Sequence, residues 1–192
     1  NTLTKSFPSC LSQKDLKGGT TSMGSDLVIN QTLLAAYRVA ATSLDPSTQN
    51  GAVLLDSNWR EIGKSNNHFP SGVSEQYWHG EKADKYARVV HAETGAILAA
   101  AKRGFSTWDS ILVCPWAACS NCAKHIADAG VSKLYRHKWA NNGVDTGSHW
   151  YDDCAIGDEI MTQAGVEIIE VEPVESDISL RRDGKQWFHH YE

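Results

Sequence analysis

The stretch RVVHAETGAILAAAKRG, residues 88–104, consists mostly of Ala, Val, Ile and Leu. This composition is typical of a short buried strand end that leads into an Ala-rich helix. His91 and Glu93 stand where the apolar run begins. Burying either polar group is unfavourable unless a partner or a metal ion compensates it. The stretch therefore predicts that another part of the chain supplies that partner, or that both side chains are exposed.

A candidate partner is the motif C-x-x-C in CPWAACSNCAK, residues 114–124. Cys119 and Cys122 are three positions apart where a helix is expected to begin, so both sulfurs lie on one face of its first turn. The unpaired N–H groups and the positive dipole end of a helix N-terminus favour thiolate over thiol. His91 also opens a helix, and helix starts that follow strands can converge at one sheet edge. We therefore predict one zinc ion held by His91, Cys119 and Cys122.

Three protein ligands leave one tetrahedral position for water, which is typical of catalytic rather than structural zinc. Two thiolates and a neutral imidazole nearly cancel the charge of the metal, so the zinc acidifies water less strongly than a three-histidine site would. A nearby base then becomes valuable, and Glu93 is two residues from a ligand. We predict Glu93 as the catalytic residue that moves protons between water, substrate and leaving group.

Each motif alone has another interpretation. An isolated C-x-x-C is also compatible with redox chemistry or simple packing, and an isolated H-x-E in a helix is mostly structural. Their combination after two strands favours zinc. Cys114, inside an expected strand, is predicted to be a packed apolar residue, and Cys10 and Cys154 are predicted to have no special role.

The bulk properties are those of an ordinary globular domain. The chain has 192 residues, 41% hydrophobic and 21% charged, and no apolar run approaches the roughly 20 residues that span a bilayer. A net charge of -5 gives no basic surface for a nucleic acid or a membrane, so we expect neither as a partner. Five cysteines and no apolar leader in NTLTKSFPSC favour reduced thiols or metal in an intracellular, cytoplasmic protein.

Periodicity predicts a flexible arm over residues 1–26 and a single domain over 27–192. Helices are expected in 27–43, after His91, in 119–130 and in 149–165, and strands in 51–56, 58–66, 110–116, 131–138 and 166–173. Residues 66–85 and 139–148 are expected to be loops, and 181–192 have no clear assignment. The alternation of helices and short strands predicts an α/β sandwich with helices on both sheet faces.

The chain resembles the cytidine deaminase superfamily of zinc enzymes, whose signature is H-x-E…P-C-x-x-C. The likeness to deoxycytidylate (dCMP) deaminases covers most of the chain, from about Leu27 to Pro173. The segments that carry it are DPSTQNGAVLLD (45–56), SNNHFPSGV (65–73), HAETGAIL (91–98), CAKHIADAGVSKLY (122–135) and HWYDDCAIGDEIMTQAGVEI (149–168). Three positions depart from the family pattern: Asn50 replaces Val, Gly95 replaces Asn, and Ala118 replaces the Pro before the first cysteine.

This resemblance implies a three-layer α/β/α sandwich with a mixed central sheet of about five strands. It also implies hydrolytic deamination of dCMP, or of a 5-substituted dCMP, to the uracil nucleotide and ammonia. The resemblance also implies that Asn67 and the backbone of Ala92 contact the substrate base. It implies a homo-oligomer with dCTP and dTTP as allosteric effectors. The candidates are Lys82, Lys85 and Arg88 for the phosphate, and Trp78, Trp116 and Trp150 for stacking on the base; their alternatives are a solvated face and the core.

Two other functions stay open at this point. The chain could deaminate another substrate class: tRNA adenosine, free cytidine or deoxycytidine, or cytosine in single-stranded nucleic acid. It could also be a non-catalytic zinc module that keeps the fold. The acidic charge and the long loop disfavour a nucleic-acid substrate, and the presence of Glu93 disfavours a structural zinc, which needs ligands but no acid or base.

Overall fold

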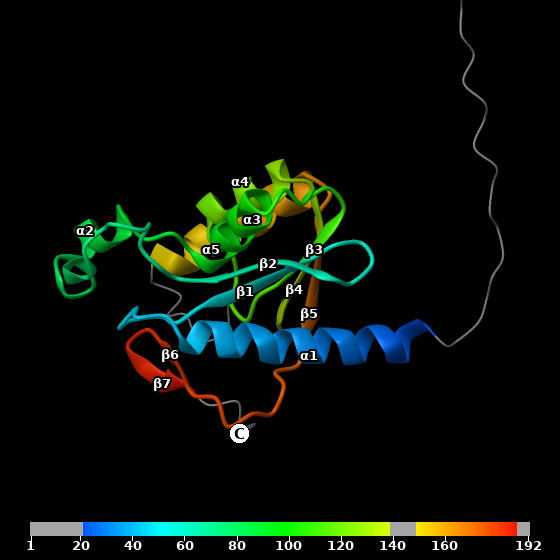
Figure 1. The fold of residues 1–192 in the computed structure, drawn as a ribbon, viewed down its shortest axis with the longest axis horizontal. Coiled ribbons are helices and arrows are strands. Elements are labelled where there is room, and N and C mark those ends of the chain that lie inside the picture. Colours follow the sequence, from blue (N-terminus) through cyan, green and yellow to red (C-terminus); the bar gives the residue numbers. More distant parts are fainter. Residues whose placement is uncertain (1–20, 139–148, 188–192) are drawn as a thin grey trace, which may run out of the picture.

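The computed structural model describes residues 21–138 and 149–187. Its centre is a five-stranded sheet in the order β2-β1-β3-β4-β5, with helices on both faces (Figure 1). No helix in these two ranges is long and apolar enough to cross a membrane. The elements are α1 (Thr21–Ala41), β1 (Gly51–Leu55), β2 (Glu61–Asn66), the 3-10 helix η1 (Glu75–His79), α2 (Lys82–Tyr86), α3 (Ala92–Lys102), β3 (Ser110–Val113), α4 (Ser120–Asp128), β4 (Val131–His137), α5 (His149–Gln163), β5 (Glu167–Val171), β6 (Leu180–Arg182) and β7 (Lys185–Trp187).

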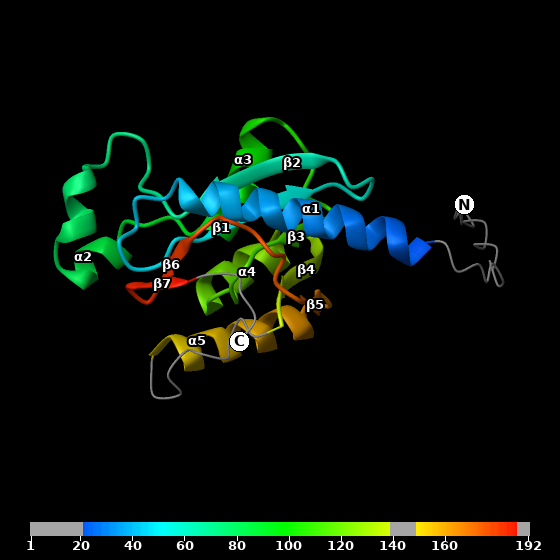
Figure 2. The same cartoon turned by 90° about the horizontal axis from the view of Figure 1, so that it is seen from below.

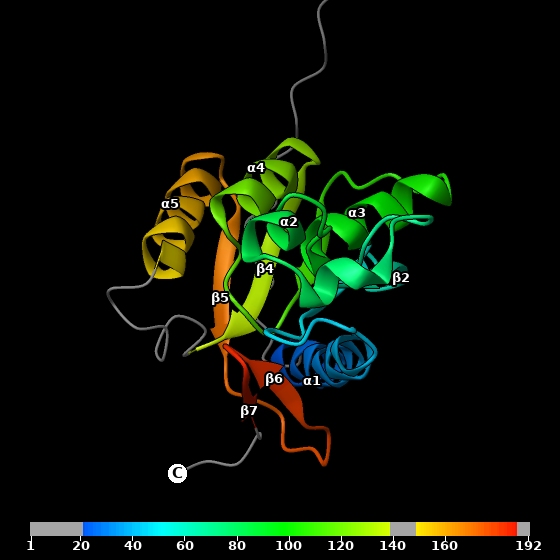
Figure 3. The same cartoon turned by 90° about the vertical axis from the view of Figure 1, so that its left-hand side faces the viewer.

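The sheet is mixed, as the sequence predicts. Strand β1 pairs antiparallel with both β2 and β3, whereas β3, β4 and β5 are parallel. Parallel neighbours need a crossover, and α4 and α5 supply the two crossovers. The starts of α3 and α4 lie at the same end of the molecule, which is where the candidate site forms (Figure 3).

Both faces of the sheet are buried, and this makes the fold three-layered. In β1, Ala52 and Leu54 belong to the core beneath α3, α4 and α5, whereas Val53 and Leu55 belong to the core against α1. Successive strand residues point to opposite faces, so a strand that is apolar at every position must be covered on both sides. Figure 2 shows α1 crossing the sheet on the face opposite the other long helices.

Helix α3 packs directly on β2 at Gly63. A Cβ at that position would lie 2.3 Å from the Ala96 carbonyl oxygen. We expect Gly63→Ala to destabilise the fold by about 1–3 kcal/mol, because the helix backbone must move away. Urea unfolding measures this change, with Gly80→Ala as the control, since its nearest new contact is at 3.8 Å. Equal stability of the two variants would contradict this packing.

The prediction of a flexible arm over 1–26 is wrong for its last six residues, because α1 begins at Thr21 and not at Leu27. A run of Ser, Thr and Gly hides the helical period there, yet one glycine costs a helix only about 1 kcal/mol and does not stop it. Residues 1–20 and the predicted loop 139–148 lie outside the described residues. The expected loop 66–85 contains η1 and the start of α2.

The tail without an assignment forms a hairpin, β6–β7, that packs below the sheet beside α1 (Figures 1 and 3). Leu180 and Trp187 belong to the α1 core. Each strand has only three residues, which is too short for a period to be recognised in the sequence.

Candidate active site

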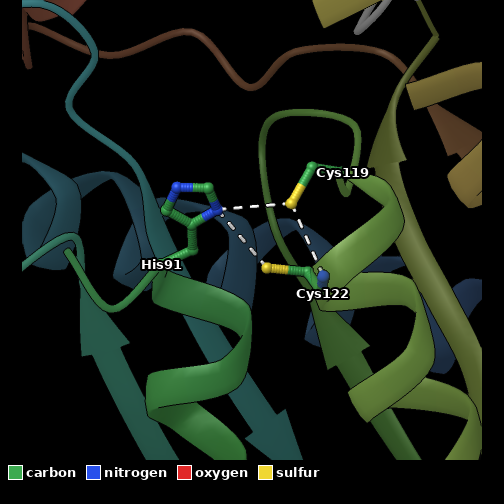
Figure 4. Close-up of side chains that lie close together, drawn as sticks. All are labelled: His91, Cys119 and Cys122. Atoms are coloured by element: carbon green, nitrogen blue, oxygen red, sulfur yellow. Dashed lines mark hydrogen bonds between the residues drawn. The ribbon is translucent and has the colours of Figure 1, made fainter. Parts of the chain in front are cut away.

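Two helix N-termini bring the predicted ligands together. His91 is the N-cap residue of α3, and Cys119 is the N-cap residue of α4, both with extended backbone. Cys122 follows in the first turn of α4. Cys119 lies on the loop that connects β3 to α4. This loop places the start of α4 next to the start of α3. Figure 4 shows the imidazole of His91 facing both thiols.

The distances fit a tetrahedral zinc ion. The His91 Nδ1 atom lies 3.4 Å from the Cys119 sulfur and 3.5 Å from the Cys122 sulfur (Figure 4). Zinc bonds of about 2.0–2.1 Å to nitrogen and 2.3 Å to sulfur, at tetrahedral angles, separate these atoms by roughly 3.6 Å. Among the residues that the structure describes, these three form the one group of ligand atoms within 4.8 Å of one another. The predicted trio therefore assembles without rearrangement.

Hydrogen bonds around the two sulfurs favour the thiolate at Cys119 and the thiol at Cys122. The hydrogen bond from the Cys122 side chain lowers the pKa of Cys119, and the same contact together with burial raises the pKa of Cys122. The Cys122 N–H also points to the Cys119 sulfur at 3.5 Å. The Thr94 hydroxyl donates to the Cys122 sulfur at 3.6 Å and lies 3.0 Å from Nδ1 of His125. Sequence reasoning missed Thr94 and His125, since neither stands in a ligand motif.

Glu93 is buried beside the metal ligands. Its side chain is 2% exposed, and Oε2 lies 3.8 Å from the Cys122 sulfur. Burial raises the pKa of Glu93 to about 7, although the nearby His91 charge opposes the shift. A carboxyl group that titrates near neutral pH can both accept and donate a proton, which is what general acid–base chemistry needs.

A cavity of about 360 Å³ opens onto this centre. Such a volume is at the lower end of small-molecule sites. Its lining joins the metal-site residues to the loop after α1, to α2, to the start of α5 and to the β6–β7 hairpin. The lining residues used below are Asp45, Asn50, Asn67, Lys82, Lys85, His91, Glu93, Trp116, Cys119, Trp150, Cys154, Arg182 and Asp183.

The sequence-family model named "Cytidine and deoxycytidylate deaminase zinc-binding region" matches residues 28–138, which include every residue of the metal centre. The chain belongs to this family. The zinc cofactor predicted from the sequence is thereby confirmed, since the family's zinc-binding region coincides with the three grouped ligands.

Individual relatives agree with this assignment. The chain is 36% identical to an uncharacterized deaminase in the luxG 3′ region of Aliivibrio fischeri, over 69% of this chain and 86% of that one. It is 32% identical to deoxycytidylate deaminase of Mus musculus, over 53% of this chain and 60% of the relative. The apo crystal structure of dCMP deaminase from cyanophage S-TIM5 superimposes with a TM-score of 0.59 at 26% identity, covering 76% of this chain and 98% of that one. The predicted fold is confirmed.

Asn67 holds the start of α3 in this deaminase. Its Oδ1 atom accepts the Ala92 N–H at 3.0 Å, and its Nδ2 atom donates to the Thr48 carbonyl at 2.9 Å. The N-cap residue His91 makes no capping hydrogen bond with its own side chain, so the side chain of Asn67, which is distant in sequence, caps the first N–H of α3 instead. The Ala92 N–H already donates a hydrogen bond to Asn67, and Ala92 does not line the cavity. The substrate contacts predicted at Asn67 and Ala92 stay predictions, and at Ala92 a base would compete with this bond.

Asn67→Ala is expected to destabilise the protein by about 1–3 kcal/mol, because it leaves the buried Ala92 N–H and the half-buried Thr48 carbonyl without this partner. Turnover should fall as well, since α3 carries His91 and Glu93. Urea unfolding and kcat measure the two effects. Asn66→Ala is the matched control, because its side chain bonds only at the surface. A rise in KM with unchanged stability would contradict the positioning role.

The predicted phosphate contacts separate into three environments. Lys85 is buried and pairs with Asp45 at 2.8 Å. Arg88 pairs with Asp84 and does not line the cavity. Lys82 lines the cavity and is exposed. Of the three cations proposed from the sequence, Lys82 is therefore the one that combines exposure with access to the pocket.

The remaining predictions divide between core and pocket. Trp116 and Trp150 line the cavity, whereas Trp78 is 5% exposed and stacks on Phe69 with ring centroids 4.0 Å apart. Cys114 is packed in the core, as predicted, and its thiol donates to Asn50. Cys154, predicted to have no special role, lies on the cavity wall in the first half of α5, and its role stays a prediction. Cys10 lies outside the described residues.

Arg182 and Asp183 line the cavity from the β6–β7 hairpin and were missed entirely. The tail lies beyond the residues that match the family model, and its strands are too short to show a period. The Asp183-Gly184 pair, which is favoured in two-residue hairpin turns, is the signal that could have indicated the hairpin. Asp45 belongs to the DPS motif quoted above, but its buried pairing with Lys85 joins residues 40 positions apart. Such a contact requires the folded chain.

Proposed function

We propose that this protein is a zinc-dependent deaminase of dCMP, or of a 5-substituted dCMP, which it hydrolyses to the corresponding uracil nucleotide and ammonia. The observation that carries the proposal is the buried Glu93 carboxyl beside three grouped metal ligands on the wall of a cavity. A purely structural zinc would need neither the acid nor the cavity. Relatives named deoxycytidylate deaminase support the choice of substrate. The chain spans about 60% of the length of the mouse relative, so its full activity is part of this proposal.

The reaction replaces the exocyclic amino group at carbon four of cytosine with an oxygen from water. Zinc, when held by His91, Cys119 and Cys122, supplies a Lewis acid that makes water a better nucleophile at neutral pH. Glu93 accepts a proton from the water and returns it to ring nitrogen three. A second proton passes through the same carboxyl group to the amine, the carbon–nitrogen bond breaks, and ammonia leaves. Burial favours the protonated form of Glu93, so the carboxyl group can hand on each proton that it accepts.

The walls of the cavity position the substrate. Trp116 and Trp150 present aromatic surface on which a flat base can pack. The buried Lys85–Asp45 pair ties α2 to the loop after α1, so two walls of the pocket are joined. Asn67 fixes the start of α3 and with it the distance between Glu93 and the metal ligands.

A substrate panel tests the proposal. Ammonia release is measured with dCMP, 5-methyl-dCMP, 5-hydroxymethyl-dCMP, cytidine, deoxycytidine and a tRNA anticodon stem. We expect dCMP or one of its 5-substituted forms to be turned over with the highest kcat/KM. A preference for the tRNA stem or for free nucleosides would contradict the nucleotide assignment. Inactivity on every substrate with zinc loaded would support a non-catalytic module.

Three further properties belong to the proposal and stay predictions. These are a homo-oligomeric assembly, regulation by dCTP and dTTP, and an intracellular location. Light scattering gives the first, and the effect of each triphosphate on kcat/KM gives the second.

A further inference from the structure

Asn50, directly before β1, places a polar side chain at the wall of the cavity. It lines the cavity, yet the residue is only 6% exposed. Of the three positions that depart from the family pattern, Asn50 is the one that lines the cavity. Gly95 is required by packing, since a Cβ there would lie 2.3 Å from the Ser65 hydroxyl oxygen, and Ala118 is fully buried in the core. Asn in place of Val therefore changes the surface that a substrate meets.

The oxygen of the Asn50 amide is occupied by two donors. Oδ1 accepts the Gly51 N–H at 3.0 Å and the Cys114 thiol at 3.3 Å. Burial raises the pKa of Cys114 well above its usual range, so the sulfur keeps the proton that it donates. Because both partners are donors, they fix which end of the amide is the oxygen. The other end is the nitrogen, which carries two N–H groups.

The Nδ2 atom of Asn50 is open to the cavity. In the described part of the chain, nothing accepts a hydrogen bond from it. Nδ2 is not enclosed by protein atoms, and the cavity is the space that this buried residue lines. An N–H group that is largely removed from water and has no acceptor is unfavourable. A ligand that brings an acceptor to this place is therefore bound more tightly.

Two contacts place this N–H beside the reacting part of the cavity. The Asn50 carbonyl accepts the Asn67 N–H at 3.2 Å, and Asn67 in turn caps α3 at Ala92. On its other side Asn50 contacts Cys114, whose pKa is raised by burial and then by the charge of Glu93. Asn50 thus lies between the end of β3 and the start of α3, which carries the catalytic carboxyl group.

The chemistry of cytosine selects the atom that this donor meets. The reaction requires carbon four to face the metal ligands and ring nitrogen three to face Glu93. The base has one further acceptor next to nitrogen three, which is carbonyl oxygen two. The Ala92 N–H is a second donor at the start of α3, but it is already given to Asn67 at 3.0 Å. The N–H of Asn50 is therefore the donor that matches this oxygen.

We propose that Asn50 donates a hydrogen bond from Nδ2 to carbonyl oxygen two of the pyrimidine and so selects and orients the base. The inference rests on the proposed function and adds a specificity-determining residue to it. A ring without an acceptor at this place leaves the N–H unpaired away from water, and such a loss discriminates more strongly than a missing apolar contact. The two bonds to Oδ1 hold the amide before the substrate arrives, which reduces the entropy lost on binding.

Two substrates that differ at this one atom test the proposal. For the zinc-loaded protein at pH 8, kcat/KM is measured with dCMP and with 2-thio-dCMP, in which sulfur, a weaker acceptor, replaces oxygen two. The proteins are wild type, Asn50→Asp, Asn50→Val and Asn58→Asp. Asp keeps an acceptor for Gly51 and Cys114 but donates no N–H, and these two donors favour its ionised form. Val is the residue of the family pattern and removes the whole amide.

Both Asn50 variants should lower kcat/KM for dCMP by about 10- to 100-fold. The change from oxygen to sulfur should cost wild type about 10-fold and each Asn50 variant less than about threefold, because the donor is already lost. Asn58→Asp is the matched control, since it is the same chemical change at an exposed residue that does not line the cavity. It should behave as wild type.

A purely structural effect of the substitutions would lower kcat/KM for both substrates alike. The ratio between the substrates would then stay as in wild type, and this result would overturn the assignment, as would full dCMP turnover in both Asn50 variants. Dissociation constants of dCMP and 2-thio-dCMP in a Glu93→Gln background give the same comparison without turnover. Binding that depends on Asn50 and oxygen two, in a wild type that does not deaminate dCMP, would contradict the proposed function and leave the inference standing.

Discussion

Glu93→Gln is expected to abolish turnover while the protein keeps its zinc. The amide has nearly the same shape as the carboxyl group but cannot accept the proton from water, and general acid–base catalysis contributes about 10²–10⁴-fold to the rate. Glu93 is not one of the three metal ligands, so the metal content should stay at one zinc per chain. Ammonia release from dCMP and elemental analysis of the purified variant measure the two quantities.

The same substitution should stabilise the metal-free protein as the pH rises. Burial raises the pKa of Glu93 from 4.5 to about 7, so the folded state holds a proton that the unfolded state gives up. Its contribution to the free energy of unfolding is full below pH 4.5 and is lost as the pH rises through 7. The loss amounts to about 3 kcal/mol at 1.36 kcal/mol per pKa unit, and Gln does not suffer it. Urea unfolding in the presence of a chelator, at pH 5 and pH 8, measures the difference.

The matched control is Glu175→Gln, the same chemical change at an exposed residue outside the cavity. It should leave turnover, zinc content and the pH dependence of stability as in wild type. Loss of zinc from the Glu93→Gln protein would show that Glu93 is a ligand and not the proton carrier. Retained turnover would remove the residue from the mechanism.

Cys119→Ala is expected to lose zinc, turnover and the stability that zinc provides. Only His91 and Cys122 remain as protein ligands, and the lost sulfur is one that lines the cavity. The metal should therefore dissociate during purification. Zinc at 1,000 times its dissociation constant adds about 4 kcal/mol to the stability of wild type, which corresponds to roughly 8–16 °C in Tm for a chain of this size. A chelator should lower the Tm of wild type by this amount and leave the Tm of Cys119→Ala unchanged.

Cys114→Ala is the control for this experiment. It also removes a buried thiol, but one that lies outside the metal group and bonds to Asn50. This variant should keep its zinc and its response to the chelator, even if packing costs it some stability. A chelator response that survives in Cys119→Ala would contradict the assignment of Cys119 as a ligand.

Local pattern was sufficient for the metal centre. Cys119 and Cys122 stand at the beginning of a helix that follows β3, as predicted. The strand end predicted before His91 is wrong, because α3 follows α2 and a loop that makes only an isolated bridge between Val90 and His68. The start of α3 nevertheless meets the start of α4. Glu93 could be predicted with them because it is two residues from a ligand. The mixed five-stranded sheet came from resemblance to a family, since periodicity indicates strands but not their pairing.

Local pattern was not sufficient for the residues that hold the centre in place. Asn67 caps α3 from a loop 25 positions away, and Lys85 pairs with Asp45 over 40 positions. Both contacts depend on how the segment 66–86, which includes α2, packs against the rest of the fold. The start of α1 was also misplaced, because weak local preference in residues 21–26 is overridden by the helix that continues into the core.

The amino-acid sequence by itself determined the three zinc ligands, because short spacings dictate which side chains share a helix turn, and it placed Glu93 two residues from one of them. The tertiary structure alone decided the walls of the cavity. Arg182 reaches the pocket only because a three-residue strand pair docks on the loop after α1, by hydrogen bonds between residues more than 130 positions apart. Contacts at such separation depend on the closed fold, and no period in the sequence records them.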